Sequence, residues 1–99
     1  MQETPAPTAV VRLPTPLRRL VGGADQLEVT ARTVGELLDG LIELHPELRT
    51  HLLDDAGELR RFVNVYVGRD DIRSLAGKAT ELGVGAEVAI VPAVAGGGR

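Results

Sequence analysis

The stretch from Thr33 to Leu44 has the pattern of an amphipathic helix, and it is the one long helix that the chain predicts. Thr33 and Glu36 have the spacing of a capping box, in which each side chain accepts a hydrogen bond from a free backbone amide at the helix start. The apolar residues recur with helical period, at Val34, Leu37, Leu38, Leu41 and Ile42. Pro46 ends the pattern. The apolar stripe of this single helix must be buried against a sheet.

Two short segments before the helix predict the strands of an N-terminal hairpin. Residues 9–13 are mostly aliphatic and are followed by two prolines, which end a strand. Residues 26–30 alternate between polar and apolar side chains, as a half-buried strand does. Between them, residues 17–21 predict a turn or a strand extension, and Gly22–Asp25 predict a turn.

The chain after the helix contains the best strand candidate, residues 62–67, which are β-branched or aromatic at five of six positions. Alternation directs the valines of this segment into the core and leaves Phe62, Asn64 and Tyr66 on the outer face. The other expected elements are a short helical turn at 48–53, an edge segment marked by Ile72 and Leu75, and a last strand at 87–91 that Pro92 ends.

This order of elements predicts an α+β fold of the β-grasp, or ubiquitin-like, type. We expect a mixed sheet of about four to five strands, with the main helix on one face. A chain of 99 residues has room for one core, which we assign to residues 9–92. Residues 1–8 are expected to be a disordered N-terminal arm, because Pro5 and Pro7 oppose regular pairing. Residues 93–99 are expected to be a flexible tail that carries a Gly-Gly end.

The composition excludes several kinds of function. There is no cysteine, so disulfides, thiolate nucleophiles and cysteine metal sites are excluded. His45 and His51 do not have metal-ligand spacing, and no metal site is expected. The formal charge is −3 and Phe62 and Tyr66 are the only aromatic residues, which disfavours nucleic acid as a partner. Because residues 1–9 lack the apolar core of a signal peptide and no apolar run could span a bilayer, we expect a cytoplasmic protein without membrane contact.

Two segments of the chain match a known family. Residues 61–73 read RFVNVYVGRDDIR, and residues 88–97 read VAIVPAVAGG. With the element order over residues 10–97, these segments resemble the MoaD/ThiS family of ubiquitin-like sulfur carrier proteins, and within it the actinobacterial carriers of cysteine biosynthesis. The resemblance implies that the chain is not an enzyme and binds no cofactor. It implies instead a cosubstrate whose C-terminal glycine is adenylated with ATP by an activating adenylyltransferase, converted to a thiocarboxylate, and then used by a sulfur-accepting biosynthetic enzyme.

The resemblance places the reactive carboxylate at Gly97. An extended chain from Pro92 to Gly97 reaches roughly 20 Å, enough to enter an enzyme tunnel. The segment inserted into partners would be Ala93, Val94, Ala95 and Gly96. Gly98 and Arg99 follow, so the resemblance also implies that a metalloprotease trims the chain. The alternatives are that Gly98 is the working terminus after loss of Arg99, or that the untrimmed chain is no carrier.

Other interpretations of the same sequence stay open. An activated glycine could be passed to target lysines by a ubiquitin-like protein modifier, or the chain could be a plain β-grasp interaction domain. A possible partner surface contains Arg61, Phe62, Asn64 and Tyr66, although residues 48–53 could equally cover its aromatic side chains. The sulfur could serve cysteine or a specialised metabolite, which the PAVAGG tail favours, or molybdopterin, thiamine or a thiolated tRNA.

Overall fold

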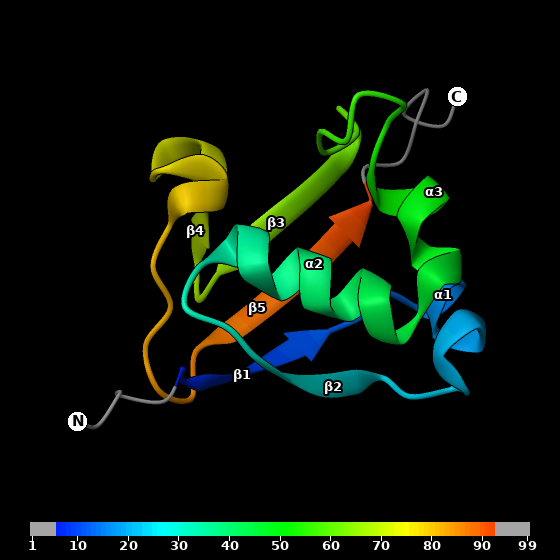
Figure 1. Cartoon of the computed structure of the whole chain (residues 1–99), viewed down its shortest axis with the longest axis horizontal. Helices are drawn as coiled ribbons and strands as arrows, with labels where there is room; N and C mark the ends of the chain where they lie inside the picture. Colours follow the sequence, from blue (N-terminus) through cyan, green and yellow to red (C-terminus); the bar gives the residue numbers. More distant parts are fainter. Residues whose placement is uncertain (1–5, 93–99) are drawn as a thin grey trace.

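The computed structural model describes residues 6–92, and it contains one mixed five-stranded sheet (Figure 1). The strands are β1 (Thr8–Arg12), β2 (Gln26–Thr30), β3 (Val63–Val67), β4 (Asp70–Asp71) and β5 (Glu87–Pro92). Their order across the sheet is β2-β1-β5-β3-β4. The pairing of β1 with β5 is parallel, and every other pairing is antiparallel. The predicted β-grasp topology is therefore confirmed, and β5 lies in the middle of the sheet.

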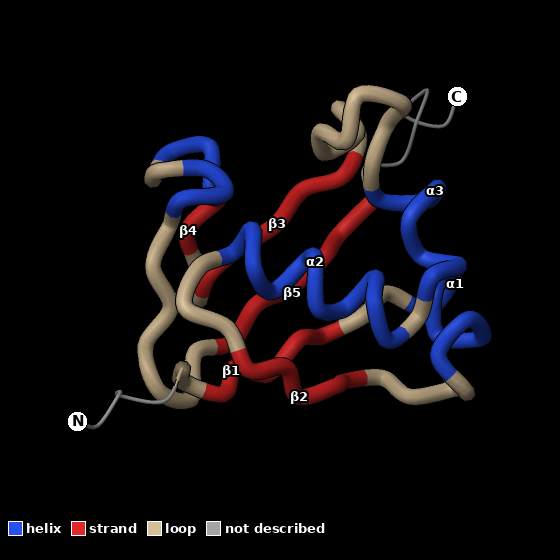
Figure 2. Tube along the Cα trace, viewed as in Figure 1, coloured by secondary structure: helices blue, strands red, loops and turns tan. Residues whose placement is uncertain are grey.

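The main helix, α2 (Val34–Leu44), lies across one face of this sheet (Figure 2). Thr33 caps it as predicted, because its hydroxyl oxygen accepts a hydrogen bond from the Glu36 amide at 3.2 Å. The Glu36 carboxylate accepts from the Arg32 amide at 3.0 Å, one residue before the position that a capping box uses. Val34, Leu37, Leu38 and Leu41 are buried, and Ile42 is partly buried. The helix thus presents the predicted stripe to the sheet.

The core fills the space between α2 and the sheet, and it is aliphatic. Alternation along β1 and β5 buries Val11, Val88 and Ile90, which meet Val63 and Val65 of β3. The predicted helical turn after α2 is present as a short 3₁₀ helix, η2 (Pro46–Leu48), and a helical turn, α3 (Arg49–Leu52). Leu48 and Leu52 are fully buried. These leucines close the core at the end of α2.

The segment between the two hairpin strands differs from its prediction. Residues 17–21 do not extend the strand but form helical turns, as part of a short helix, α1 (Thr15–Arg18), and a 3₁₀ helix, η1 (Arg19–Val21). Pro16 has a φ angle suited to the first turn of a helix and needs no amide partner there. Leu17 and Val21 are buried. A helical turn brings both side chains to the core, which local sequence alone does not reveal.

Three other boundaries also differ. β1 begins at Thr8, which pairs with Thr30, so the last residue assigned to the N-terminal arm belongs to the sheet. β5 extends through Pro92, which lies opposite Val63. The predicted edge segment at Ile72 and Leu75 is a 3₁₀ turn, η3 (Ile72–Ser74), and the edge strand is β4 just before it. A further 3₁₀ turn, η4 (Gly77–Ala79), follows. Residues 1–5 and 93–99, which include most of the predicted arm and the whole tail, lie outside the described residues.

Candidate functional site

The C-terminal tail begins at the end of the central strand. β5 is held by β1 on one side and by β3 on the other, and Pro92 lies opposite Val63 at the start of β3. The predicted reactive residue Gly97, its alternative Gly98 and the predicted insertion segment 93–96 lie outside the described residues. β1 pairs with residues 87–89 of β5 and β3 with residues 88–92, so among the described residues the strand end from which the tail starts is paired with β3.

The outer face of the sheet, opposite α2, contains two of the predicted partner-surface residues. Tyr66 lies beside Ala89 of β5, and Asn64 lies beside Val91. Tyr66 and Asn64 are half-buried, whereas Val91 keeps 42% of its surface exposed. These side chains form a partly apolar strip next to the tail root, as the prediction of a partner surface requires.

Phe62 does not share this strip, and the predicted alternation is wrong at this residue. β3 begins at Val63, and Arg61 and Phe62 form the turn before it. Phe62 lines a pocket together with Val63 and with Leu52 of α3, on the helical side of the sheet. The side chain is still 46% exposed, so the 48–53 segment flanks it without covering it. Arg61 is exposed in the same turn.

Arg73 organises this region, although its role was not predicted from the sequence. Its guanidinium donates hydrogen bonds to Asn64 Oδ1 at 2.6 Å and to the carbonyl oxygens of Val63 and Arg61 at 3.0 and 3.2 Å. Asp71 holds the backbone of Arg73 through a 2.8 Å hydrogen bond to its amide. Arg73 is the last residue of the family-like segment 61–73, which is the only sequence signal that pointed to it.

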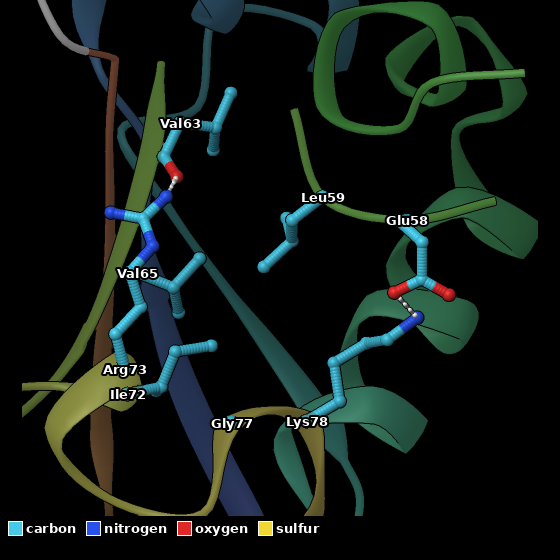
Figure 3. A pocket seen from close by; sticks show the side chains of 8 residues that line it. All are labelled: Glu58, Leu59, Val63, Val65, Ile72, Arg73, Gly77 and Lys78. Carbon is cyan, nitrogen blue, oxygen red and sulfur yellow. Dashed lines mark hydrogen bonds and ion pairs between the residues drawn. The ribbon is translucent and has the colours of Figure 1, made fainter. Parts of the chain in front are cut away.

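A second pocket, of about 250 Å³, lies beside Arg73 (Figure 3). Its walls come from β3, η3, η4 and the loop before β3, with Leu59, Val65 and Ile72 pointing into it (Figure 3). Lys78 crosses the opening to form an ion pair with Glu58 at 3.7 Å and donates to the Gly57 carbonyl at 3.3 Å. The chain's single lysine is thus engaged in joining two loops.

The acidic and histidine side chains of the described residues are spread apart or used in turns. Within residues 6–92, no group of three or more His, Cys, Asp or Glu side chains could hold a metal ion. Asp54 accepts hydrogen bonds from the amides of Ala56 and Glu58, as a turn residue does. In the same part of the chain, no helix is long and apolar enough to cross a bilayer. What the described structure presents is a paired tail root and its surroundings.

Known proteins are similar to this chain over most of its length. The model of the ThiS family matches residues 11–97. The sulfur carrier protein CysO of Mycobacterium tuberculosis is 38% identical over 89 residues, which cover 88% of this chain and 96% of that protein. A crystal structure of the BexX/CysO complex of Amycolatopsis orientalis contains a chain with a TM-score of 0.82 and 36% identity, covering 89% of this chain and 98% of that one. The small archaeal modifier protein 1 of Methanosarcina acetivorans has a TM-score of 0.83 and 26% identity, with 95% and 99% coverage.

Proposed function

This chain belongs to the ThiS family, and we propose that it is a sulfur carrier that holds sulfur as a thiocarboxylate on Gly97. The observation that carries the proposal is the position of the tail, a small-residue segment that follows the central strand of a β-grasp sheet. The family match ends at Gly97, two residues before Arg99, which favours Gly97 over Gly98 as the working terminus.

The proposed cycle assigns the chemistry to partner enzymes. An activating adenylyltransferase joins the Gly97 carboxylate to the AMP part of ATP and releases pyrophosphate. Sulfide then displaces AMP and leaves the thiocarboxylate directly. A persulfide would displace AMP to form an acyl disulfide, from which a second thiol releases the thiocarboxylate as it forms a disulfide with the donor sulfur. The carrier contributes the acyl group and no acid, base or cofactor, so it is a cosubstrate and not an enzyme. Gly96 and Gly97 have no Cβ, which lets the backbone approach the nucleotide closely. Because the cycle uses ATP, we place it in the cytoplasm.

Processing must precede activation under this proposal. The carboxylate that is adenylated has to be free at Gly97, but Gly98 and Arg99 follow it. We propose that a metalloprotease removes these two residues. The full-length chain is then a precursor that the activating enzyme does not use.

The sulfur acceptor is proposed to be a biosynthetic enzyme. The likeness to CysO and to the chain in the BexX/CysO complex favours an enzyme that makes cysteine or a specialised metabolite. Molybdopterin, thiamine or a thiolated tRNA would be made by the same sulfur transfer from the thiocarboxylate to a different acceptor.

A second candidate is a protein modifier, favoured by the likeness to the small archaeal modifier protein 1. The activated glycine would then form an amide with a lysine of a target protein. Lys78 is the chain's only lysine and is ion-paired with Glu58, so chains linked through this protein are not expected. Attachment of one copy to another protein would be the product.

One experiment tests these proposals together. The full-length chain and versions that end at Gly98 and Gly97 are incubated with ATP, sulfide and the activating enzyme, and intact mass is measured. We expect replacement of one oxygen by sulfur only in the version that ends at Gly97. Modification of the Gly98 version alone would identify Gly98 as the working terminus. If a competent activating enzyme modified none of the versions, the carrier function would be refuted. Addition of cell extract then tests for lysine-linked products.

A further inference from the structure

An apolar pocket of about 190 Å³ lies at the root of the tail, on the helical side of the sheet. It is lined by Pro16, Leu17, His51, Leu52, Phe62, Val63 and Ile90. Two of these residues connect it to the tail, because Ile90 precedes Pro92 by two positions and Val63 lies opposite Pro92. The pocket therefore lies beside the point at which the chain leaves β5, where α1 and α3 come together (Figure 1).

The segments that form the pocket wall are positively charged. Residues 15–21, 48–53 and 59–64 contain five arginines, namely Arg18, Arg19, Arg49, Arg60 and Arg61, as well as His51. No Asp or Glu residue lies within these segments, although Glu47, Asp54 and Glu58 border them directly. With these three carboxylates counted, the segments still have a net formal charge of +2, in a chain whose formal charge is −3.

None of these five arginines forms an ion pair within the described structure. The three ion pairs among residues 6–92 involve other cations, Arg12, Arg73 and Lys78. Arg18 and Arg60 are held in place by hydrogen bonds from Nε to the carbonyl oxygens of Leu13 and Thr50, at 3.0 and 2.8 Å. Arg19, Arg49 and Arg61 are exposed. Two arginines are thus oriented by hydrogen bonds to backbone carbonyls, and three are exposed in the segments that line the pocket.

We propose that the pocket and these five arginines, together the tail-root surface, dock onto an acidic surface of the activating enzyme that inserts an apolar side chain into the pocket. An apolar centre inside a charged rim is the usual anatomy of a protein interface. Carboxylates on the partner supply the complementary charge, which accelerates encounter and rejects wrong partners. A nucleic acid is disfavoured, because Phe62 is the only aromatic residue at this surface and base stacking needs such platforms. The inference rests on the proposed function.

The position of this surface gives it a specific role. Docking next to Pro92 holds the end of β5 against the enzyme, so the tail enters the active site from a fixed point. Rim charges act mainly on association and on its salt dependence. Loss of the charge should therefore raise the KM for the carrier and leave kcat nearly unchanged.

The test uses the chain that ends at Gly97 with the activating enzyme and ATP, and it measures pyrophosphate release at several carrier concentrations. The double variant Arg49→Glu/Arg61→Glu is expected to raise KM about tenfold at low salt, and the difference should shrink as ionic strength rises. Arg49→Lys/Arg61→Lys keeps the charge and should stay near the wild-type KM. Arg69→Glu reverses one charge in the exposed turn between β3 and β4, and it is the matched control for the single variants Arg49→Glu and Arg61→Glu. Phe62→Asp tests the pocket and should also raise KM.

The outcomes separate this inference from the proposed function. Thermal unfolding of each variant shows whether the fold is intact. Turnover of the Arg49→Glu/Arg61→Glu variant with an unchanged KM, or single variants with no more effect than Arg69→Glu, would overturn the docking surface alone. The docking surface would also be overturned if the wild type bound a DNA duplex and the Arg49→Glu/Arg61→Glu variant lost that binding while its KM stayed unchanged. Absence of pyrophosphate release with the wild-type chain would overturn the proposed function, and this inference with it.

Discussion

The guanidinium of Arg73 donates a 2.6 Å hydrogen bond to Oδ1 of Asn64, and so connects η3 to β3 beside the tail root. β4 pairs only with Tyr66 and Val67, which leaves the first half of β3 without a strand partner among the described residues on that side. Arg73 occupies this edge and donates to the carbonyl oxygens of Val63 and Arg61. An unpaired edge invites pairing with other chains, and a charged side chain across it opposes that.

Arg73→Ala is expected to destabilise the protein, because three acceptors lose their donor at once. Its side chain is 53% exposed, so water replaces part of the loss and the ion pair with Asp71 adds little. We expect the free energy of unfolding to fall by about 1 kcal/mol, which corresponds to roughly 4–8 °C in Tm for a domain of this size. Urea or thermal unfolding measures it. Arg69→Ala, in the neighbouring turn, should change little, and equal effects of the two substitutions would contradict the role of Arg73.

The N-cap of α2 provides a second prediction. Thr33→Ala removes the hydroxyl that accepts from the Glu36 amide, and it should lower the free energy of unfolding by about 1 kcal/mol. Thr33→Ser keeps the acceptor and is the matched control. Urea unfolding of both variants gives the comparison. If serine destabilised as much as alanine, the methyl group and not the cap would explain the loss.

The buried face of α2 should be far more sensitive than its end. Leu37 is fully buried, so Leu37→Ala leaves a cavity and should cost about 2–5 kcal/mol of unfolding free energy. Leu44 is 62% exposed in the same helix, and Leu44→Ala should stay within about 0.5 kcal/mol of the wild type. Chemical unfolding monitored by circular dichroism tests both. Comparable losses would mean that the exposed leucine is packed in solution.

Gly97→Ala in the chain that ends at residue 97 tests the tail. The added Cβ should hinder approach to the nucleotide, so we expect a loss of adenylation measured by pyrophosphate release. We expect Tm to stay unchanged, since the core of the described structure is formed by residues between Ala9 and Ile90. A marked fall in Tm would show that the tail stabilises the fold. Ala95→Gly is the control, because it changes a residue of the same segment without adding side-chain atoms.

The elements that local sequence specifies strongly were predicted well. α2 has both a cap and a helical stripe, and β2 coincides with its predicted residues 26–30. The errors fall where tertiary contacts decide. Residues 17–21 became helical because Leu17 and Val21 have to reach the core. Phe62 lies outside β3, because it belongs to the turn before Val63 and lines a pocket with Leu52. The network around Arg73 joins residues nine to twelve positions apart, and no short-range pattern encodes it.

By itself, the sequence determined the β-grasp class, the capped helix and the family-like tail, because each follows from a periodic pattern or a contiguous motif. The tertiary structure decided how the tail root is built. Pairing of β5 with β3 sets Pro92 opposite Val63, and residues of α1, α3 and the turn before β3 line one pocket beside it, which brings three arginine-containing segments together. Such a grouping depends on contacts between distant residues. The charge of each arginine can be read from the sequence, but its position beside the tail exists only in the folded chain.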